Sequence, residues 1–426
     1  MMDLLPVFIL FLLFAANVPV AFALAIAGLS FFMMTNGIQH QIFIQRFVAV
    51  THSFPLLAIP FFIMTGVIMN HSGITDRLMK LADSLTGHRV GGLAQVNILL
   101  STLMGGMSGS ANADTAMQSK IMVPQMNQRG YHTAFSAAVT ACSSIISVII
   151  PPGIGLILYG YMGDVSIGKL FLAGVIPGIV LCIALMIVAH RISRIRLYAP
   201  SQPQKSSLTD RLIALRNASW SLMVPIGIIG GIRFGFFTPT EAGAIAVIYA
   251  IIVGYIHRQF SVKALPAIMK ETVIATSTVM FIICAASTFS FYLSWERLPV
   301  QVANAMLAIT DNPYLLLLII NLLLVAVGMF IEGGAALIIL TPILVPIITK
   351  VGIDPVHFGI VMVLNLTIAG VTPPLGTLMF TACSISKVSV KEFVKEVLPF
   401  LAMLIAVLLL LTFVPQISLW LPSTMN

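Results

Sequence analysis

The chain has 426 residues, of which 59% are hydrophobic and only 8% are charged. An ordinary soluble domain is about 25% charged, so this composition excludes a soluble globular protein and favours one embedded in a bilayer. The formal net charge of +8 would suggest a nucleic-acid partner in a soluble protein. In a membrane protein, Lys and Arg collect in the cytoplasmic loops, and no nucleic acid is expected.

Continuous apolar runs of the length needed for a transmembrane helix recur along the sequence. A transmembrane β-barrel would instead need short segments of alternating polarity. We therefore predict an all-α polytopic membrane protein with about 11 membrane helices, or with fewer continuous spans plus two re-entrant hairpins.

The first half, residues 1–200, is predicted to contain helices near 3–16, 19–35, 54–70, 132–160 and 168–190. The helix 132–160 should break at Pro151 and Pro152, because proline lacks the N–H group and clashes with the preceding turn. Segment 91–127 has two apolar arms around a polar tip, residues 105–112, which is typical of a re-entrant hairpin. Segment 73–87 mixes apolar and charged residues at helical spacing, as interfacial helices do, although a short cytoplasmic loop is the alternative.

A polar linker, 201–212, leads to the second half, residues 213–426. This half is predicted to contain helices near 213–232, 239–257, 273–294, 354–386 and 397–420, with a hairpin at 313–349. Segment 261–271 is the second interfacial candidate. The helix 354–386 should break at Pro373 and Pro374.

The two halves resemble each other at a nearly constant offset. The Pro-Pro pairs begin at Pro151 and Pro373, which are 222 residues apart, and Gly130 and Gly352 have the same separation. Each half is predicted to cross the membrane an odd number of times, so the second repeat should be inverted relative to the first.

The distribution of positive charge predicts the orientation. Lys and Arg gather in cytoplasmic loops. With the N-terminus outside, the inner loops carry most of them, including Arg191, Arg194, Arg196, Lys387, Lys391 and Lys395, whereas the outer side carries Arg46, Lys169, Arg233, Arg297 and Lys350. Both termini are therefore predicted to lie outside.

The polar hairpin tips predict two sodium sites. Non-helical backbone in hydrocarbon leaves unpaired polar groups at a cost of several kcal/mol each, so such tips persist only where they are buried in protein or face water. Their oxygen atoms suit a small hard cation, and the helix N-termini at the breaks suit an anionic substrate. The first predicted sodium site comprises Ser108, Ser110, Asn112, Asp114 and Pro151, and the second comprises Glu332, Gly333, Gly334, Thr367, Gly370, Thr372 and Pro373.

Several stretches together resemble the large membrane subunit of tripartite ATP-independent periplasmic (TRAP) transporters. They are LLAIPFFIMTGVIMN, SGSANADTA, IIPPGIGLILYG, FTPTEAGAIAVIYA, GIDPVHFGIVMVLN and TPPLGTLMF, and they cover nearly the whole chain in order. The overall pattern is most similar to members that carry sialic acid. Many relatives have Asp at the position of Glu332, so direct ligation by this longer side chain stays open.

The resemblance implies Na⁺-coupled uptake of an organic acid in the bacterial inner membrane, so that the termini predicted to lie outside would be periplasmic. It also implies an elevator motion, in which the hairpins and broken helices form a transport domain that moves against a scaffold formed by the remaining helices. Sialic acid is the favoured substrate and a C4-dicarboxylate is next. The implied partners are a small four-helix membrane subunit and a soluble periplasmic substrate-binding protein. No cofactor is expected besides Na⁺ as the coupling ion.

The predicted substrate ligands are Arg297, Lys120, Ser108, Gly153 and Gly376. Arginine binds carboxylates through two hydrogen bonds, but Arg297 could equally pair with Glu296 or extend to the membrane interface. Lys120 could equally neutralise Asp114.

Other classes of function fit the residues less well. A stand-alone divalent-anion/Na⁺ symporter with similar hairpins is the main alternative, and it would need no binding protein. An intramembrane enzyme would need a catalytic or metal-binding set at membrane depth. The His and Cys residues show no metal-ligand spacing, so neither an enzyme nor a structural metal is expected.

Overall fold

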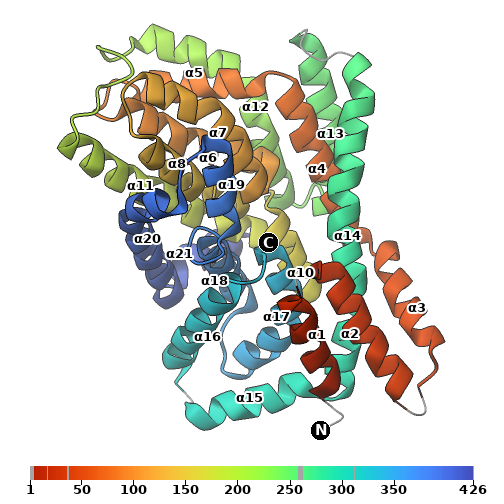
Figure 1. Ribbon diagram of the computed structural model, residues 1–426. Coiled ribbons are helices and arrows are strands. Elements are labelled where there is room, and N and C mark those ends of the chain that lie inside the picture. The colour runs from red at the N-terminus through yellow and green to blue at the C-terminus, as the bar shows by residue number, and fades with distance from the viewer. Residues whose placement is uncertain (1–3, 17, 36–37, 258–261, 311, 426) are drawn as a thin grey trace.

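The computed structural model describes residues 4–16, 18–35, 38–257, 262–310 and 312–425. Within these ranges every regular element is a helix (Figure 1). The all-α class predicted from the apolar runs is thereby confirmed.

The helices follow the predicted order in both halves. In the first half they are α1 (Leu5–Ala15), α2 (Val20–Met34), α3 (Gln41–Ala49), α4 (Ala58–His71), α5 (Ile74–Thr86), α6 (Gly92–Ser108), α7 (Ala111–Gln128), α8 (Thr133–Ser143), α9 (Ile146–Ile149), α10 (Ile154–Met162) and α11 (Ile167–Ile195). In the second half they are α12 (Leu208–Arg233), α13 (Pro239–Ile256), α14 (Leu265–Trp295), α15 (Leu298–Ile309), α16 (Pro313–Gly328), α17 (Gly333–Lys350), α18 (Pro355–Ala369), α19 (Thr377–Ser386), α20 (Val390–Phe413) and α21 (Gln416–Leu419).

Seven of the described helices are long and apolar enough to cross a bilayer, and an eighth span results if α8–α9 and α10 count as one helix bent by 46°. The predicted first crossing is shorter than expected. Helix α1 has 11 residues, which rise about 16 Å, whereas the hydrocarbon core is about 30 Å thick. The odd number of crossings and the inverted repeat therefore stay predictions.

Three elements differ from the sequence-based expectation. Helices α3 and α15 were not predicted, because their runs of 9 and 12 residues are too short to register as spans. The interfacial segment 261–271 is not separate. Residue 261 lies outside the described residues, and from Leu265 onward the segment continues into α14, which has 31 residues.

Both predicted hairpins consist of two helices joined by a short tip. Helices α6 and α7 form the first, and α16 and α17 form the second. The first tip is shorter than predicted, since α6 stays helical through Ser108 and only Gly109 and Ser110 separate the two arms. The glycines at 105 and 106 serve close packing instead, since a Cβ on Gly106 would lie 2.4 Å from the Pro225 side chain.

The hairpins and the broken helices of the two halves pack across each other. Helix α10 of the first half contacts α17 of the second, and α19 of the second contacts α7 of the first. A hydrogen bond reinforces this arrangement, because the buried Tyr159 hydroxyl donates to the carbonyl of Pro355 over 2.7 Å. Helices α2, α4, α13 and α14 pack together on another side of the molecule (Figure 1).

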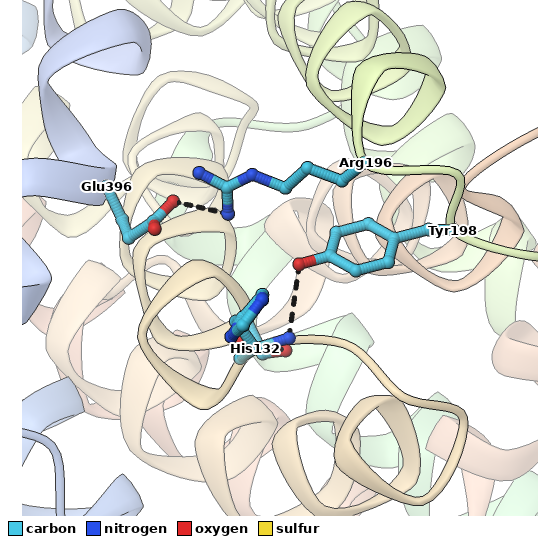
Figure 2. Close-up of polar contacts among 5 residues, drawn as sticks. His132, Arg196, Tyr198 and Glu396 are labelled. Atoms are coloured by element: carbon cyan, nitrogen blue, oxygen red, sulfur yellow. Dashed lines mark hydrogen bonds and ion pairs between the residues drawn. The ribbon is translucent and has the colours of Figure 1, made fainter.

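The segment between α11 and α12 is held against the ends of neighbouring helices. Arg196 forms an ion pair with Glu396 of α20 at 2.9 Å, and the Tyr198 hydroxyl accepts a hydrogen bond from the backbone N–H of His132 (Figure 2). The ring of Tyr198 stacks on Tyr131 with centroids 4.3 Å apart. The linker that joins the halves is thus anchored at its start rather than free.

Candidate functional site

A cavity of about 170 Å³ lies where both hairpin tips meet both helix breaks. Its lining comes from five places that are far apart in sequence, namely the two tips, the two breaks, and Val279 and Ile282 of α14. These residues include Ser110, Asn112, Ile154, Gly155, Glu332, Gly333, Gly334, Leu366, Thr367, Gly370, Thr377 and Leu378. The two predicted tips and the two predicted breaks therefore enclose one common space.

The first tip is fastened directly to the first break. Gly109 has a φ of +57°, and its carbonyl accepts a hydrogen bond from the N–H of Ile154 over 3.1 Å. A Cβ on Gly109 would lie only 2.4 Å from the carbonyl oxygen of Pro152. Both the left-handed backbone and the close approach require glycine here.

The second tip lies against the second broken helix. A Cβ on Gly328 would lie 2.6 Å from the Cβ of Ala369, and one on Gly333 would lie 3.5 Å from the carbonyl oxygen of Leu366. The tip thus approaches α18 just before its end at Ala369.

Ser110 and Glu332, which match at the offset of 222, have the same local role. Each is the N-cap of the second hairpin arm. The Ser110 hydroxyl accepts from the N–H of Ala113 over 3.4 Å, and the Glu332 carboxylate accepts from the N–H of Ala335 over 3.0 Å. N-cap side chains satisfy one of the four N–H groups that a helix start leaves unpaired.

Four helices, α7, α10, α17 and α19, begin at this cavity, and the first residues of each contribute to its lining. The start of a helix carries a partial positive charge and unpaired N–H groups. Glu332 is the one charged side chain in the lining among the described residues. The cavity thus combines four positive helix ends with a single carboxylate.

The structure places the predicted residues of the first sodium site in two groups. Ser110 and Asn112 line the cavity, whereas Ser108, Asp114 and Pro151 are not part of its lining. The Asp114 side chain is buried, and its Oδ1 accepts a hydrogen bond from Gln118 over 2.9 Å. Within the described chain, Oδ2 of Asp114 and the Ser108 hydroxyl are both buried without a hydrogen-bond partner.

The predicted residues of the second sodium site also divide. Glu332, Gly333, Gly334, Thr367 and Gly370 line the cavity, whereas Thr372 and Pro373 do not. The Thr367 hydroxyl donates to the Val363 carbonyl over 2.6 Å, which leaves its lone pairs for a ligand.

The carbonyl of Gly370 is less available than the sequence suggested. It already accepts hydrogen bonds from the N–H groups of Leu378 and Met379 at 2.9 and 3.2 Å. A carbonyl oxygen has two lone pairs, so these two bonds hold the start of α19 and occupy the acceptor.

Two of the predicted substrate ligands lie away from this cavity. Arg297 is exposed at the start of α15. Lys120 is exposed on α7, almost three helical turns after the tip. Neither is part of the lining. Gly153 and Gly376 are the N-caps of α10 and α19, directly next to lining residues.

Comparison with known proteins identifies the family. A family model described as "Tripartite ATP-independent periplasmic transporter, DctM component" matches residues 7–417. The chain belongs to this family. The resemblance found in the sequence motifs is confirmed.

Curated relatives of this TRAP permease cover nearly its whole length. The sialic acid TRAP transporter large permease SiaM of Vibrio cholerae is 41% identical over 96% of this chain and 95% of its own. The C4-dicarboxylate TRAP transporter large permease DctM of Pseudomonas aeruginosa is 36% identical over 87% of this chain and 86% of its own. These relatives are permeases rather than enzymes. As a member of this family, the chain is a multi-pass protein of the bacterial inner membrane.

Solved membrane transporters share the fold at low sequence identity. The YdaH transporter of Alcanivorax borkumensis superimposes with a TM-score of 0.64 at 15% identity, covering 87% of this chain and 86% of that one. A likeness at this level concerns the fold alone.

The TRAP permease also contains a buried polar network that the sequence analysis missed. Asn97 and Ser101 of α6 donate to Thr140 and Ser143 of α8 over 2.7 and 2.9 Å, and Gln118 of α7 donates to Ser101 over 2.6 Å. These polar side chains recur three or four residues apart within apolar runs, so they share one helix face, and this spacing could have predicted the network. Through Gln118 the network connects to Asp114 in the first turn of α7.

Proposed function

We propose that this TRAP large permease takes up an organic acid together with Na⁺, by an elevator motion of the hairpins and broken helices. The observation that carries the proposal is the cavity at which four helices begin around a single carboxylate. Helix N-termini favour an anion, and Glu332 favours a cation beside it. A carboxylate and Na⁺ bound together would satisfy both.

The position of the basic residues supports binding of the anion by backbone N–H groups. Among the described residues, the lining includes no Lys or Arg. An acid held without a fixed side-chain cation gains additional stabilisation from an accompanying Na⁺, and this would couple the two. In this proposal, Arg297 and Lys120 do not contact the bound substrate in the cavity.

The proposed sodium ligands of the first site are Ser110 and Asn112 at the tip, together with Ser108 and Asp114. The unpaired buried oxygens of Ser108 and Asp114 support this assignment, since a buried polar atom is normally satisfied. At the second site the proposed ligands are Glu332 and Thr367.

The proposed substrate is a sialic acid, with a C4-dicarboxylate as the next candidate, because relatives named for each are similar over most of the chain. A small membrane subunit and a periplasmic binding protein are the proposed partners. The proposed orientation has both termini in the periplasm.

The test is uptake of radiolabelled N-acetylneuraminate and succinate into proteoliposomes that contain the permease, its small subunit and its binding protein. We expect uptake to require an inward Na⁺ gradient and to be lost when the binding protein is omitted. Uptake by the permease alone would support a stand-alone symporter instead.

Three variants test the ion sites in the same assay. We expect Ser108→Ala, Asp114→Ala and Thr367→Val each to abolish Na⁺-stimulated uptake while the protein stays folded. Thr349→Val is the matched control. The hydroxyl of the exposed Thr349 donates to the Val345 carbonyl one turn back, just as the Thr367 hydroxyl donates to the Val363 carbonyl, but Thr349 lies far from the tip. Unchanged sodium dependence in all three variants would remove the proposed sites.

A further inference from the structure

A second, larger cavity of about 600 Å³ lies between α3, α14 and the segment that joins α10 to α11. Among the described residues, the linings of the two cavities have no residue in common. Its lining includes Arg46, Tyr161, Asp164, Ser287, Ser290, Phe291, Ser294 and Trp295. The volume is within the range of roughly 300–1,000 Å³ that is common for small-molecule sites.

Arg46 is held in place at the edge of this cavity. Its guanidinium carbon lies 4.8 Å from the centroid of the Phe291 ring, and its backbone carbonyl accepts a hydrogen bond from the Ser287 hydroxyl over 3.1 Å. Stacking on an aromatic ring leaves the edge of a guanidinium open for a two-bond contact with a carboxylate. Among the described ion pairs, none involves Arg46.

The rest of the lining matches a hydroxylated ligand. Ser287, Ser290 and Ser294 are spaced by three and four residues, so they share one face of α14. The aromatic side chains of Phe291 and Trp295 belong to the same helix end and can cover the apolar face of a sugar ring. Hydroxyl groups beside an aromatic surface suit a polyhydroxylated molecule.

Asp164 sets the direction in which an acid could bind. Its carboxylate is in the same lining as Arg46 and repels another carboxylate, so the acid group must lie at the Arg46 end. Asp164 can instead accept hydrogen bonds from hydroxyl or amide N–H groups of the ligand. A simple dicarboxylate would bring a second negative charge toward Asp164.

We infer that the cavity at Arg46 is a second binding site for a hydroxylated monocarboxylic acid, separate from the central cavity. We further infer that the transported acid binds here before it reaches the central cavity, and this role rests on the proposed function. In the proposed orientation this site faces the periplasm. The segment from Tyr161 to Asp164 connects it to α10, which begins at the central cavity.

Trp295 provides a test that does not depend on transport. The chain has three tryptophans, and Trp220→Phe with Trp420→Phe leaves Trp295 as the only one. The full chain is placed in phosphatidylcholine nanodiscs, and Trp295 fluorescence is titrated with N-acetylneuraminate, with succinate and with the neutral sugar mannose. We expect a saturable change with N-acetylneuraminate, and an affinity at least about ten-fold weaker for the other two.

Substitutions then locate the signal. We expect Arg46→Gln to weaken N-acetylneuraminate binding roughly ten-fold or more, with partial recovery in Arg46→Lys. Arg233→Gln is the matched control, since Arg233 is also exposed and lies 5.7 Å from the Phe234 ring, but it is not part of this lining. Thr367→Val, in the central cavity, should leave the Trp295 signal unchanged.

Several results would overturn the inference. They are the absence of a saturable change in the otherwise unsubstituted protein, an unaltered signal in Arg46→Gln, and loss of the signal in Thr367→Val alone. A response to phosphatidylglycerol in the nanodisc that N-acetylneuraminate cannot displace would assign Arg46 to lipid headgroups instead. Failure of Na⁺-driven uptake with intact Trp295 binding would count against the proposed function and not against this site.

Discussion

Glu332 combines two roles that can be separated experimentally. Its carboxylate caps α17 through the N–H of Ala335 and also lines the central cavity. The neighbouring Gly334 leaves room for this side chain, since a Cβ there would lie 3.0 Å from Oε2 of Glu332. The capping role needs only an oxygen acceptor, whereas the proposed sodium role needs the negative charge.

Glu332→Gln is expected to preserve the fold and to weaken sodium binding. The amide oxygen can still cap the helix, so the free energy of unfolding should change by less than about 1 kcal/mol. The sodium concentration for half-maximal uptake should rise at least about ten-fold, because an ion loses a charged ligand. Glu332→Ala, which loses both roles, is the comparison, and equal sodium dependence in Glu332→Gln and wild type would contradict the assignment.

The cavity residues at the tips could be predicted from the sequence because their positions repeat. The offset of 222 links Ser110 to Glu332, and both are N-caps at the cavity. Lys120 and Arg297 were proposed as substrate ligands because of their charge, and neither lies in the lining of the central cavity. Their charge is visible in the sequence, but the direction in which a helix presents a side chain depends on how the hairpins pack.

At the scale of elements, α5 is fastened to α13 through a histidine. The Arg77 guanidinium lies 3.2 Å from Nε2 of His257, at the end of α13. Burial and then the charge of Arg77 lower the pKa of His257 from its ordinary value of 6.5. The neutral imidazole can accept the hydrogen bond, whereas the protonated ring cannot.

This contact should make stability depend on pH. An unfolded chain protonates His257 near pH 6.5, whereas the folded chain binds that proton only at lower pH. The contribution to stability is therefore present above pH 6.5 and is lost as the pH falls below that value. We expect the fall in Tm between pH 7.5 and 5.5 to be smaller in His257→Gln than in wild type. His52→Gln, at an exposed histidine, is the control, and an equal effect of both variants would contradict the prediction.

The ion pair between Arg196 and Glu396 connects the linker to α20 (Figure 2). The two side chains are 33% and 18% exposed, so solvent screens part of the attraction. A double-mutant cycle with Arg196→Gln and Glu396→Gln should give a coupling energy of about 0.5–1 kcal/mol. Arg194→Gln paired with Glu396→Gln is the control and should show no coupling. A coupling of zero for the first pair would indicate that the linker is not held by this contact.

The sequence predicted the long elements better than the short ones. Apolar runs placed α11, α13 and both hairpins within a few residues of their observed bounds. Helices α3 and α15 are short and contact the remainder of the protein through α14 and α17, so tertiary packing rather than local pattern determines them. The second cavity was missed for the same reason, because α3 contributes Arg46 to it.

At the scale of the whole molecule, the proposed inversion places the bases of the two hairpins on opposite sides of the membrane. The first base is near Gln128 and the second near Lys350, and both residues are exposed. The four native cysteines are buried, so they give little background in labelling experiments.

We expect Gln128→Cys to react with a membrane-impermeant maleimide only after cells are permeabilised, and Lys350→Cys to react in intact cells. Ser206→Cys, in the linker, should behave like Gln128→Cys. Labelling of both hairpin bases from the same side would disprove the inverted arrangement, even if uptake itself is normal.

The crossed packing of α10 on α17 and α19 on α7, with the bond from Tyr159 to Pro355, has a consequence for the energetics of the proposed cycle. Two tips joined in this way must move as one rigid body, so both sodium ions would cross the membrane together with the acid. The current carried per turnover would then equal the number of sodium ions minus the charge of the acid. A measured ratio of charge to substrate that is constant across membrane voltages would be the electrical signature of that rigidity.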